Sequence, residues 1–138
     1  MSVIVPHRAV EAISTAKDPR KAIPELVGNL DGIEVIGDMV LVGIYIRPER
    51  TAGGIIRPTS NKQEDVWQGK VGLVLKWGPD AFRDPENNGE LFPQHAEVGE
   101  WCVFKVGDGW SLNINDYPCR LVRDTAIRLK VKDPNTIL

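Results

Sequence analysis

Short runs of β-branched and aromatic residues, separated mostly by glycine, proline or asparagine, occupy the chain from Ile33 onward. The runs are IEVIG, DMVLVGIYI, GKVGLVLKWG, WCVFKVG, WSLNI, CRLVR and AIRLKVK. In residues 39–46 every second residue is valine or isoleucine, and this period of two is typical of a β-strand. Several short strands with turn residues between them predict an all-β domain, either a small barrel or a sandwich.

The first thirty residues have a different pattern. Apolar residues at a spacing that helices can use are Val10, Ile13, Ile23, Leu26 and Val27. Pro19 and Pro24 limit these helices to short pieces, and Asn-Leu-Asp-Gly at 29–32 indicates a boundary. We therefore expect an N-terminal extension of short helices at residues 1–32 and a β-domain at residues 33–138.

Two turns are predicted from glycine and asparagine. Asn88-Gly89 is the pair preferred in type I′ turns. Gly107-Asp108-Gly109 is a second, glycine-flanked hairpin signal. Two of the predicted connections, residues 47–68 and 78–98, are long for so small a domain, and long loops are usually functional.

The first long connection contains the stretch RTAGGIIRP at residues 50–58. Gly53 and Gly54 can take a positive φ at no steric cost, which suits a loop. Ile55 and Ile56 are apolar, although the surrounding segment is polar and charged. A lone apolar patch of this kind often marks a partner site, so this tip is the candidate functional site.

Composition and charge exclude several classes of partner. The net charge of −2 disfavours a nucleic-acid partner bound through phosphate neutralisation. No apolar run approaches the roughly 20 residues of a membrane-spanning helix, and the N-terminus lacks the pattern of a signal peptide. Cys102 and Cys119 are read as reduced, buried residues of a cytoplasmic protein.

The sequence offers no constellation for catalysis. It has no GxGxxG fingerprint, and its histidines, His7 and His95, lie near no cysteine at zinc-ligand spacing. Both histidines are read as polar surface residues. We therefore expect neither an enzyme nor a metal site nor a cofactor.

Four segments follow one another between about Ile33 and Asp133. They are Asp38 with the strand MVLV, Thr51–Ile56, Gly69-Lys70-Val71 with a strand that ends at Trp77-Gly78, and Val98-Gly99-Glu100 before the strand Trp101–Phe104. This order resembles that of the GroES-like co-chaperonins. The AGGI core and the VG-acid-strand segment are the specific parts of the resemblance.

The resemblance implies a small, irregular GroES-like β-barrel with a long mobile loop and a roof hairpin. It also implies a homo-oligomeric ring of seven subunits that caps a GroEL-like chaperonin at its apical surface during ATP-dependent protein folding. In that family an aliphatic triad directly after the two glycines carries the contact. The matching positions form the tip, which is Gly53, Gly54, Ile55, Ile56 and Arg57.

Two departures from the family leave an alternative open. The third position of the triad is the charged Arg57, and the first thirty residues have no counterpart in ordinary co-chaperonins. A phage virion protein that decorates or cements the capsid could reuse the barrel and grip the major capsid protein with the extension and the loop. The double glycine at 53–54 favours the co-chaperonin instead.

Overall fold

The computed structural model describes residues 18–46, 70–105 and 107–137. The tip at 53–57 and the helices expected before residue 18 lie outside these ranges. The described part contains one α-helix, α2 (Pro19–Val27). Its strands are β1 (Met39–Ile44), β2 (Val71–Trp77), β3 (Arg83–Asp84), β4 (Glu90–Leu91), β5 (Trp101–Phe104), β6 (Trp110–Ile114), β7 (Tyr117–Arg123) and β8 (Ile127–Val131).

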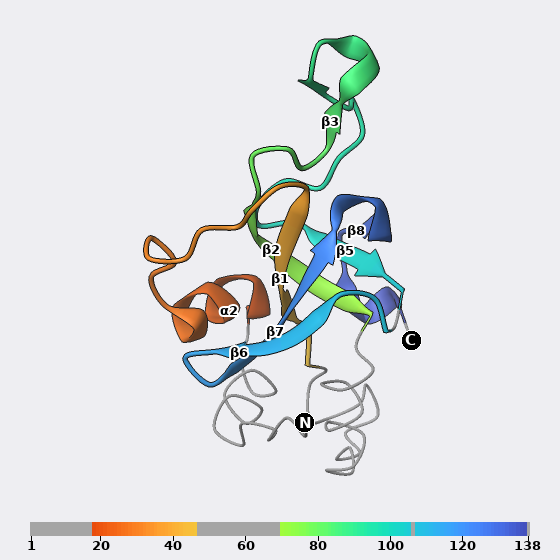
Figure 1. Cartoon of the computed structure of the whole chain (residues 1–138). Coiled ribbons are helices and arrows are strands. Elements are labelled where there is room, and N and C mark those ends of the chain that lie inside the picture. Colours follow the sequence, from red (N-terminus) through yellow and green to blue (C-terminus); the bar gives the residue numbers. More distant parts are fainter. Residues whose placement is uncertain (1–17, 47–69, 106, 138) are drawn as a thin grey trace.

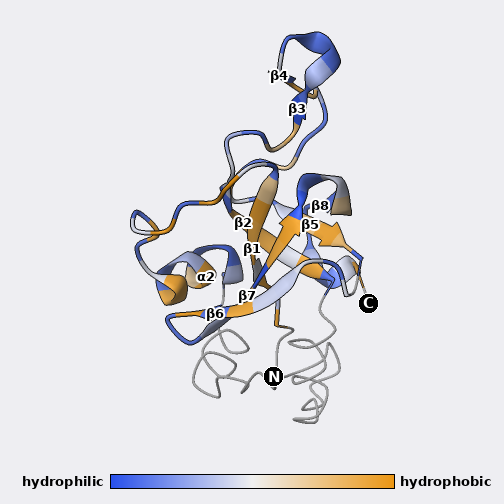
Figure 2. Ribbon diagram, viewed as in Figure 1, coloured by the Kyte–Doolittle hydropathy of each residue, from blue (hydrophilic) through white to orange (hydrophobic). Residues whose placement is uncertain are grey.

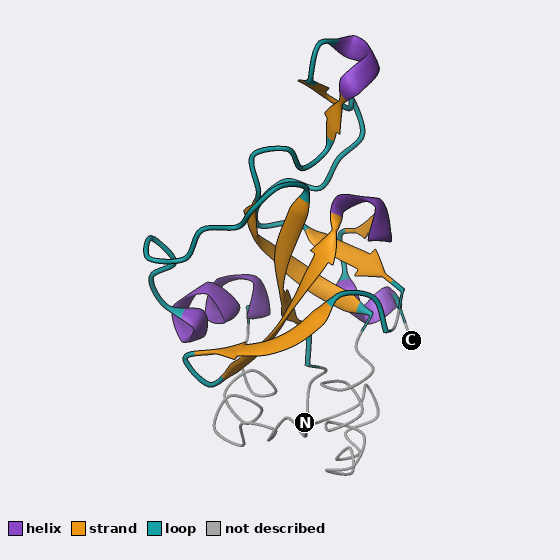
Figure 3. Ribbon diagram, in the orientation of Figure 1, coloured by secondary structure: helices purple, strands orange, loops and turns teal. Residues whose placement is uncertain are grey.

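Six of the strands form one antiparallel sheet in the order β6-β7-β1-β2-β5-β8 (Figure 1). Short 3-10 helices at Pro85–Asn87, Asp124–Ala126 and Pro134–Thr136 join or follow strands (Figure 3). The predicted β-rich fold is confirmed, and the arrangement is that of a small, irregular barrel. The hydropathy colouring places apolar residues along the strands at the centre of this sheet (Figure 2).

Strand β1 is buried on both faces. Val40, Val42 and Ile44 join one apolar cluster, together with residues of β2, β5 and β7. Leu41 and Tyr45 join a second cluster on the opposite face. The predicted alternation therefore holds from Val40 to Ile44, whereas Ile46 joins the second cluster with Tyr45. The strand has no polar face, because its second face is covered as well.

Helix α2 supplies much of that cover. Its residues Ile23 and Val27 are fully buried in the second cluster. The side chain of Asp18 caps the helix by accepting a hydrogen bond from the backbone N–H of Arg20. The interior proline, Pro24, lies on the exposed side of the helix. The short extension helix is thus part of the core, while the domain boundary at residue 32 stays a prediction.

Polar contacts fix the chain that follows the helix. Asn115 Nδ2 donates to the carbonyl of Val27 at 2.5 Å. Lys76 Nζ donates to the carbonyls of Leu30 at 2.9 Å and Ile33 at 2.6 Å. The lysine therefore holds residues 30–33 against β2.

One of the two predicted turns is correct. In the β3–β4 hairpin, Asn88 and Gly89 have φ values of 56° and 74°, as a left-handed turn requires. Gly107-Asp108-Gly109, by contrast, forms no hairpin, because β5 pairs with β2 and β8 whereas β6 pairs with β7. The hairpin in this region is β6–β7, whose turn uses Asn115 and Asp116 at φ 49° and 65°.

The packing of α2 predicts a steric coupling. A Cβ added at Gly43 would lie 2.6 Å from Cγ2 of Ile23. Gly43→Ala should cost about 1–3 kcal/mol of unfolding free energy through overpacking, and Ile23→Ala about 2–5 kcal/mol through a cavity. In the double variant the new methyl fills space that the isoleucine has left, so the total should fall below the sum by about 0.5–3 kcal/mol.

Urea denaturation of the four proteins checks this coupling. Lys21→Ala, on the exposed side of the same helix, is the matched control and should stay within about 0.5 kcal/mol of the parent. Additive costs for the two core changes would mean that α2 does not pack on Gly43.

Candidate functional site

The candidate tip, Gly53 to Arg57, lies outside the described residues, and the structure shows how its segment joins the sheet. The segment begins after Ile46, two residues beyond the end of β1, and ends before Lys70. Ile44 is opposite Gly72 in the β1–β2 register, and the N–H of Tyr45 donates to the carbonyl of Val71 at 3.0 Å. The two ends of the segment are therefore neighbours at one end of the barrel.

Buried side chains hold the end at residue 46. Ile46 is fully buried. The ring of Tyr45 packs edge-on against Trp101 with centroids 5.1 Å apart, and its hydroxyl donates to Asn135 Oδ1 at 2.6 Å. The hydroxyl of Tyr117 donates to the carbonyl of Ile44 at 2.6 Å. Burial raises the pKa of Tyr117, so this phenol keeps its proton and remains a donor.

The second long loop, residues 78–98, leaves from the opposite end of the barrel. β1 and β2 are antiparallel, and Val40 pairs with Trp77 at this end. The loop carries the β3–β4 hairpin, which projects away from the sheet (Figure 1). Its outer part is hydrophilic in Figure 2, and Glu86 and Glu90 are exposed there, while Asp80 is exposed nearer the barrel. The predicted hairpin is therefore present, and it carries exposed acidic side chains.

The outgoing side of the hairpin base has a strained backbone. Phe82 has a φ of 58°, a conformation that costs a bulky L-residue about 1–2 kcal/mol. Its N–H donates to Asp124 Oδ2 at 2.8 Å, and its carbonyl accepts from the N–H of Phe92 at 2.8 Å. Its ring packs edge-on against Trp77 with centroids 5.3 Å apart. These contacts hold the strained residue.

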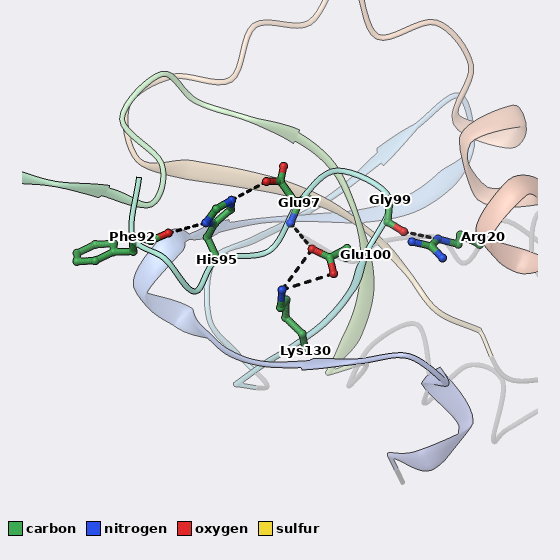
Figure 4. A network of polar contacts seen from close by, with 7 residues as sticks. All are labelled: Arg20, Phe92, His95, Glu97, Gly99, Glu100 and Lys130. Atoms are coloured by element: carbon green, nitrogen blue, oxygen red, sulfur yellow. Dashed lines mark hydrogen bonds and ion pairs between the residues drawn. The ribbon is translucent and has the colours of Figure 1, made fainter. Parts of the chain in front are cut away.

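The returning side of the base contains His95, whose side chain is only 15% exposed. His95 is therefore a polar residue near the surface, as predicted, but its side chain is largely covered by its neighbours. Its Nδ1 lies 2.6 Å from the carbonyl oxygen of Phe92, and its Nε2 lies 2.6 Å from Glu97 Oε1 (Figure 4). The hydrogen bond with Glu97, followed by the bond to the Phe92 carbonyl, raises the pKa of His95.

The turn after His95 joins three parts of the molecule. The N–H of Glu97 donates to Glu100 Oε1 at 2.8 Å, and Lys130 Nζ lies 3.4 Å from the same oxygen (Figure 4). The N–H of Glu97 is the main cause of the lowered pKa of Glu100, and Lys130 adds to it. Arg20 Nε of helix α2 donates to the carbonyl of Gly99. The turn thus connects the hairpin base with β8 and α2.

Among the described residues, β8 pairs only with β5, so the sheet has an open edge there. Leu129 in this strand is 49% exposed, between the exposed Arg128 and Lys130. A groove of about 580 Å³ lies beside the strand. Its lining includes Phe82, Phe92, His95, Asp124, Ile127 and Leu129. On another part of the surface Ile36 is 76% exposed, although its neighbour Val35 is buried.

Within the described ranges, no group of three or more histidine, cysteine, aspartate or glutamate residues could hold a metal ion. Cys102 and Cys119 are free and buried, as predicted. Burial raises the pKa of each thiol to about 12, so both stay protonated. None of the helices in the described part is long and apolar enough to span a membrane.

The hairpin base was not predicted as a site from sequence. A carboxylate two residues after His95 was the one local signal for the His95–Glu97 pair. Nothing local indicated that Asp124 would reach the N–H of Phe82.

Comparisons with known proteins give the family. The model of the family described as "Chaperonin 10 Kd subunit" matches residues 32–131. Co-chaperonin GroES 1 of Rhodopirellula baltica is 28% identical over 96 residues, which are 70% of this chain and 88% of the relative. Co-chaperonin GroES of Solidesulfovibrio magneticus is 28% identical over 95 residues, which are 69% of this chain and 92% of the relative. Helix α2 precedes the matched residues, whereas the sheet, the hairpin and the anchors of the 47–69 segment fall within them, and the chain belongs to the Chaperonin 10 Kd subunit family.

Proposed function

We propose that this chain is a cytoplasmic co-chaperonin subunit that caps a GroEL-like chaperonin and assists ATP-dependent protein folding. The observation that carries the proposal is the family match over residues 32–131, within which both anchors of the tip segment lie side by side. The protein acts by binding, and the nucleotide chemistry belongs to the chaperonin. The tip, Gly53 to Arg57, is the part that reaches the apical surface.

The geometry of the anchors supports this use of the tip. The ends of the segment are fixed by Tyr45, Ile46 and Val71 in the barrel. A tip that binds the partner therefore attaches the whole barrel to it. A tip that becomes ordered on binding gives up about 2–5 kcal/mol of the interaction free energy. Each contact is then weak and reversible, as a lid that cycles requires, and several copies on a ring recover the affinity.

The open sheet edge supports assembly into a ring, for which we propose seven subunits. β8 has hydrogen-bonding groups along one side that no strand of the described residues meets, and Leu129 is exposed on it. An extended segment of a neighbouring copy can add to such an edge. Residues 33–37, with Ile36 exposed, are our proposed partner segment. The hairpin would then stand at the end of the ring opposite the tips.

We do not put forward the capsid protein as a second function. Its support was Arg57 together with the N-terminal extension, and the described helix of that extension has a role in the core. Both relatives named above are co-chaperonins. Arg57 bears on which chaperonin is bound. Arginine in an apolar groove carries a desolvation cost, and an acidic group on the partner would offset it.

Replacing Ile55 and Ile56 by serine should leave the barrel folded and abolish capture by the chaperonin. The loss of two leucine-sized contacts costs about 1.5–3 kcal/mol for each side chain, and the effect multiplies around a ring. Capture is measured by co-elution with a GroEL-type chaperonin and ATP, and folding by circular dichroism.

Asn61→Ser, a polar change in the same segment, is the control and should bind as the parent does. A double variant that unfolds or aggregates would place the isoleucines in the core. A double variant that binds normally would move the contact away from the tip.

Arg57→Leu should strengthen binding to a standard chaperonin. It restores the aliphatic third position and removes a desolvation cost, so a gain of about 1.5 kcal/mol or more per site, roughly tenfold or more, is expected. Titration of the chaperonin with parent and variant measures the change. Weaker binding by the leucine variant would show that Arg57 meets an acidic group on its partner.

A further inference from the structure

The two hydrogen bonds of His95 require a proton on each ring nitrogen. Both atoms that face the ring, the Phe92 carbonyl oxygen and Glu97 Oε1, are acceptors, and each lies 2.6 Å away (Figure 4). A neutral imidazole carries one N–H, whereas the imidazolium carries two. Both contacts are therefore complete only in the charged form.

These contacts join the hairpin to the barrel. Phe92 directly follows strand β4 of the hairpin. Glu97 begins the turn that is fixed to β2, where the N–H of Gly99 donates to Val74 at 2.9 Å and the N–H of Val74 donates to Glu100 at 3.0 Å. His95 thus connects a projecting element with a rigid one.

The other side of the base is strained and faces the same ring. Phe82, with its positive φ, is held by Asp124. The ring centroid of Phe82 lies 6.1 Å from that of His95, and the ring centroid of Trp77 lies 5.5 Å from that of His95. A change in the position of His95 would therefore reach both sides of the base.

The groups around His95 come from several elements. Glu97, on its own segment, favours the charged form, and Lys130 of β8 opposes it. Asp124 and Arg128 line the groove that His95 also lines. Trp77 and Phe82 present uncharged rings. Glu100, three residues after Glu97, accepts hydrogen bonds from Lys130.

We propose that the base of the β3–β4 hairpin is a pH-sensitive clasp, closed while His95 is an imidazolium and loosened when it loses a proton. Because Phe92, His95 and Leu129 line one groove beside the open sheet edge, the clasp also sets the shape of that surface. The proposal concerns the hairpin of this chain and stands whether or not the chain caps a chaperonin.

The direction of the effect follows from the raised pKa of His95 in the closed form. The stabilisation is fully present below the ordinary pKa of about 6.5 and is lost as the pH rises through the raised value. For each unit by which closure raises the pKa of His95, the equilibrium constant for closing is about tenfold larger at low pH than at high pH. Raising the pH above the raised pKa of His95 should therefore loosen the hairpin.

NMR on the full chain tests the clasp. The sequence has two histidines, so His95→Gln assigns the ring signals. We expect His95 to titrate above 6.5 and the protection factors of amides in residues 82–95, corrected for intrinsic exchange, to fall through the same midpoint. His95→Gln should show no such transition, and Glu97→Gln should lower the midpoint and move the transition with it.

Glu86→Gln, an exposed change in the same hairpin, is the matched control and should leave the midpoint unchanged. A His95 midpoint at or below 6.5 would overturn the proposal. So would hairpin protection that changes with pH equally in the parent and in His95→Gln, and this comparison holds even if the Glu97 variant fails to fold.

Discussion

Strand β1 is buried on both of its faces, and this double burial fixes the positions of the surrounding elements. One face, which includes Val42, packs in the first apolar cluster. The other face is covered by helix α2, which lies over Gly43. Tyr45 and Ile46 directly follow the strand and belong to the cluster on the helix side, so the packing that holds β1 also holds the residues just before the 47–69 segment. A helix that precedes the family-matched residues therefore stabilises the scaffold on which the proposed tip stands.

The 47–69 segment and the β3–β4 hairpin start from opposite ends of the barrel and differ in the residues they carry. The tip segment leaves from the end of the sheet at Ile44, and the hairpin leaves from the end at Trp77. The tip carries an apolar pair, whereas the hairpin is acidic and exposed beyond a base formed by Phe82 and His95. In our account the first binds the partner, and the second changes its attachment with protonation. Both depend on rigid anchors rather than on any catalytic group.

Local patterns predicted the strands and the Asn88-Gly89 turn, because periodicity and left-handed turn residues are properties of neighbouring positions. The Asn115-Asp116 turn was missed because it lacks the glycine that marked 107–109. The contact of α2 with Gly43 and the hydrogen bond from Phe82 to Asp124 join residues distant in sequence, and they were not predictable from spacing. The tip at 53–57 came from residues and a family resemblance together, and it stays a prediction.

The mass of the purified chain in solution, alone and with a GroEL-type chaperonin and ATP, decides whether this barrel serves as a lid. A ring near seven times the 15.3 kDa chain that moves into a larger particle only with chaperonin and nucleotide is the predicted result. A monomer or other small oligomer that ignores the chaperonin would contradict the account, and would mean that the family's fold has been kept here for another task.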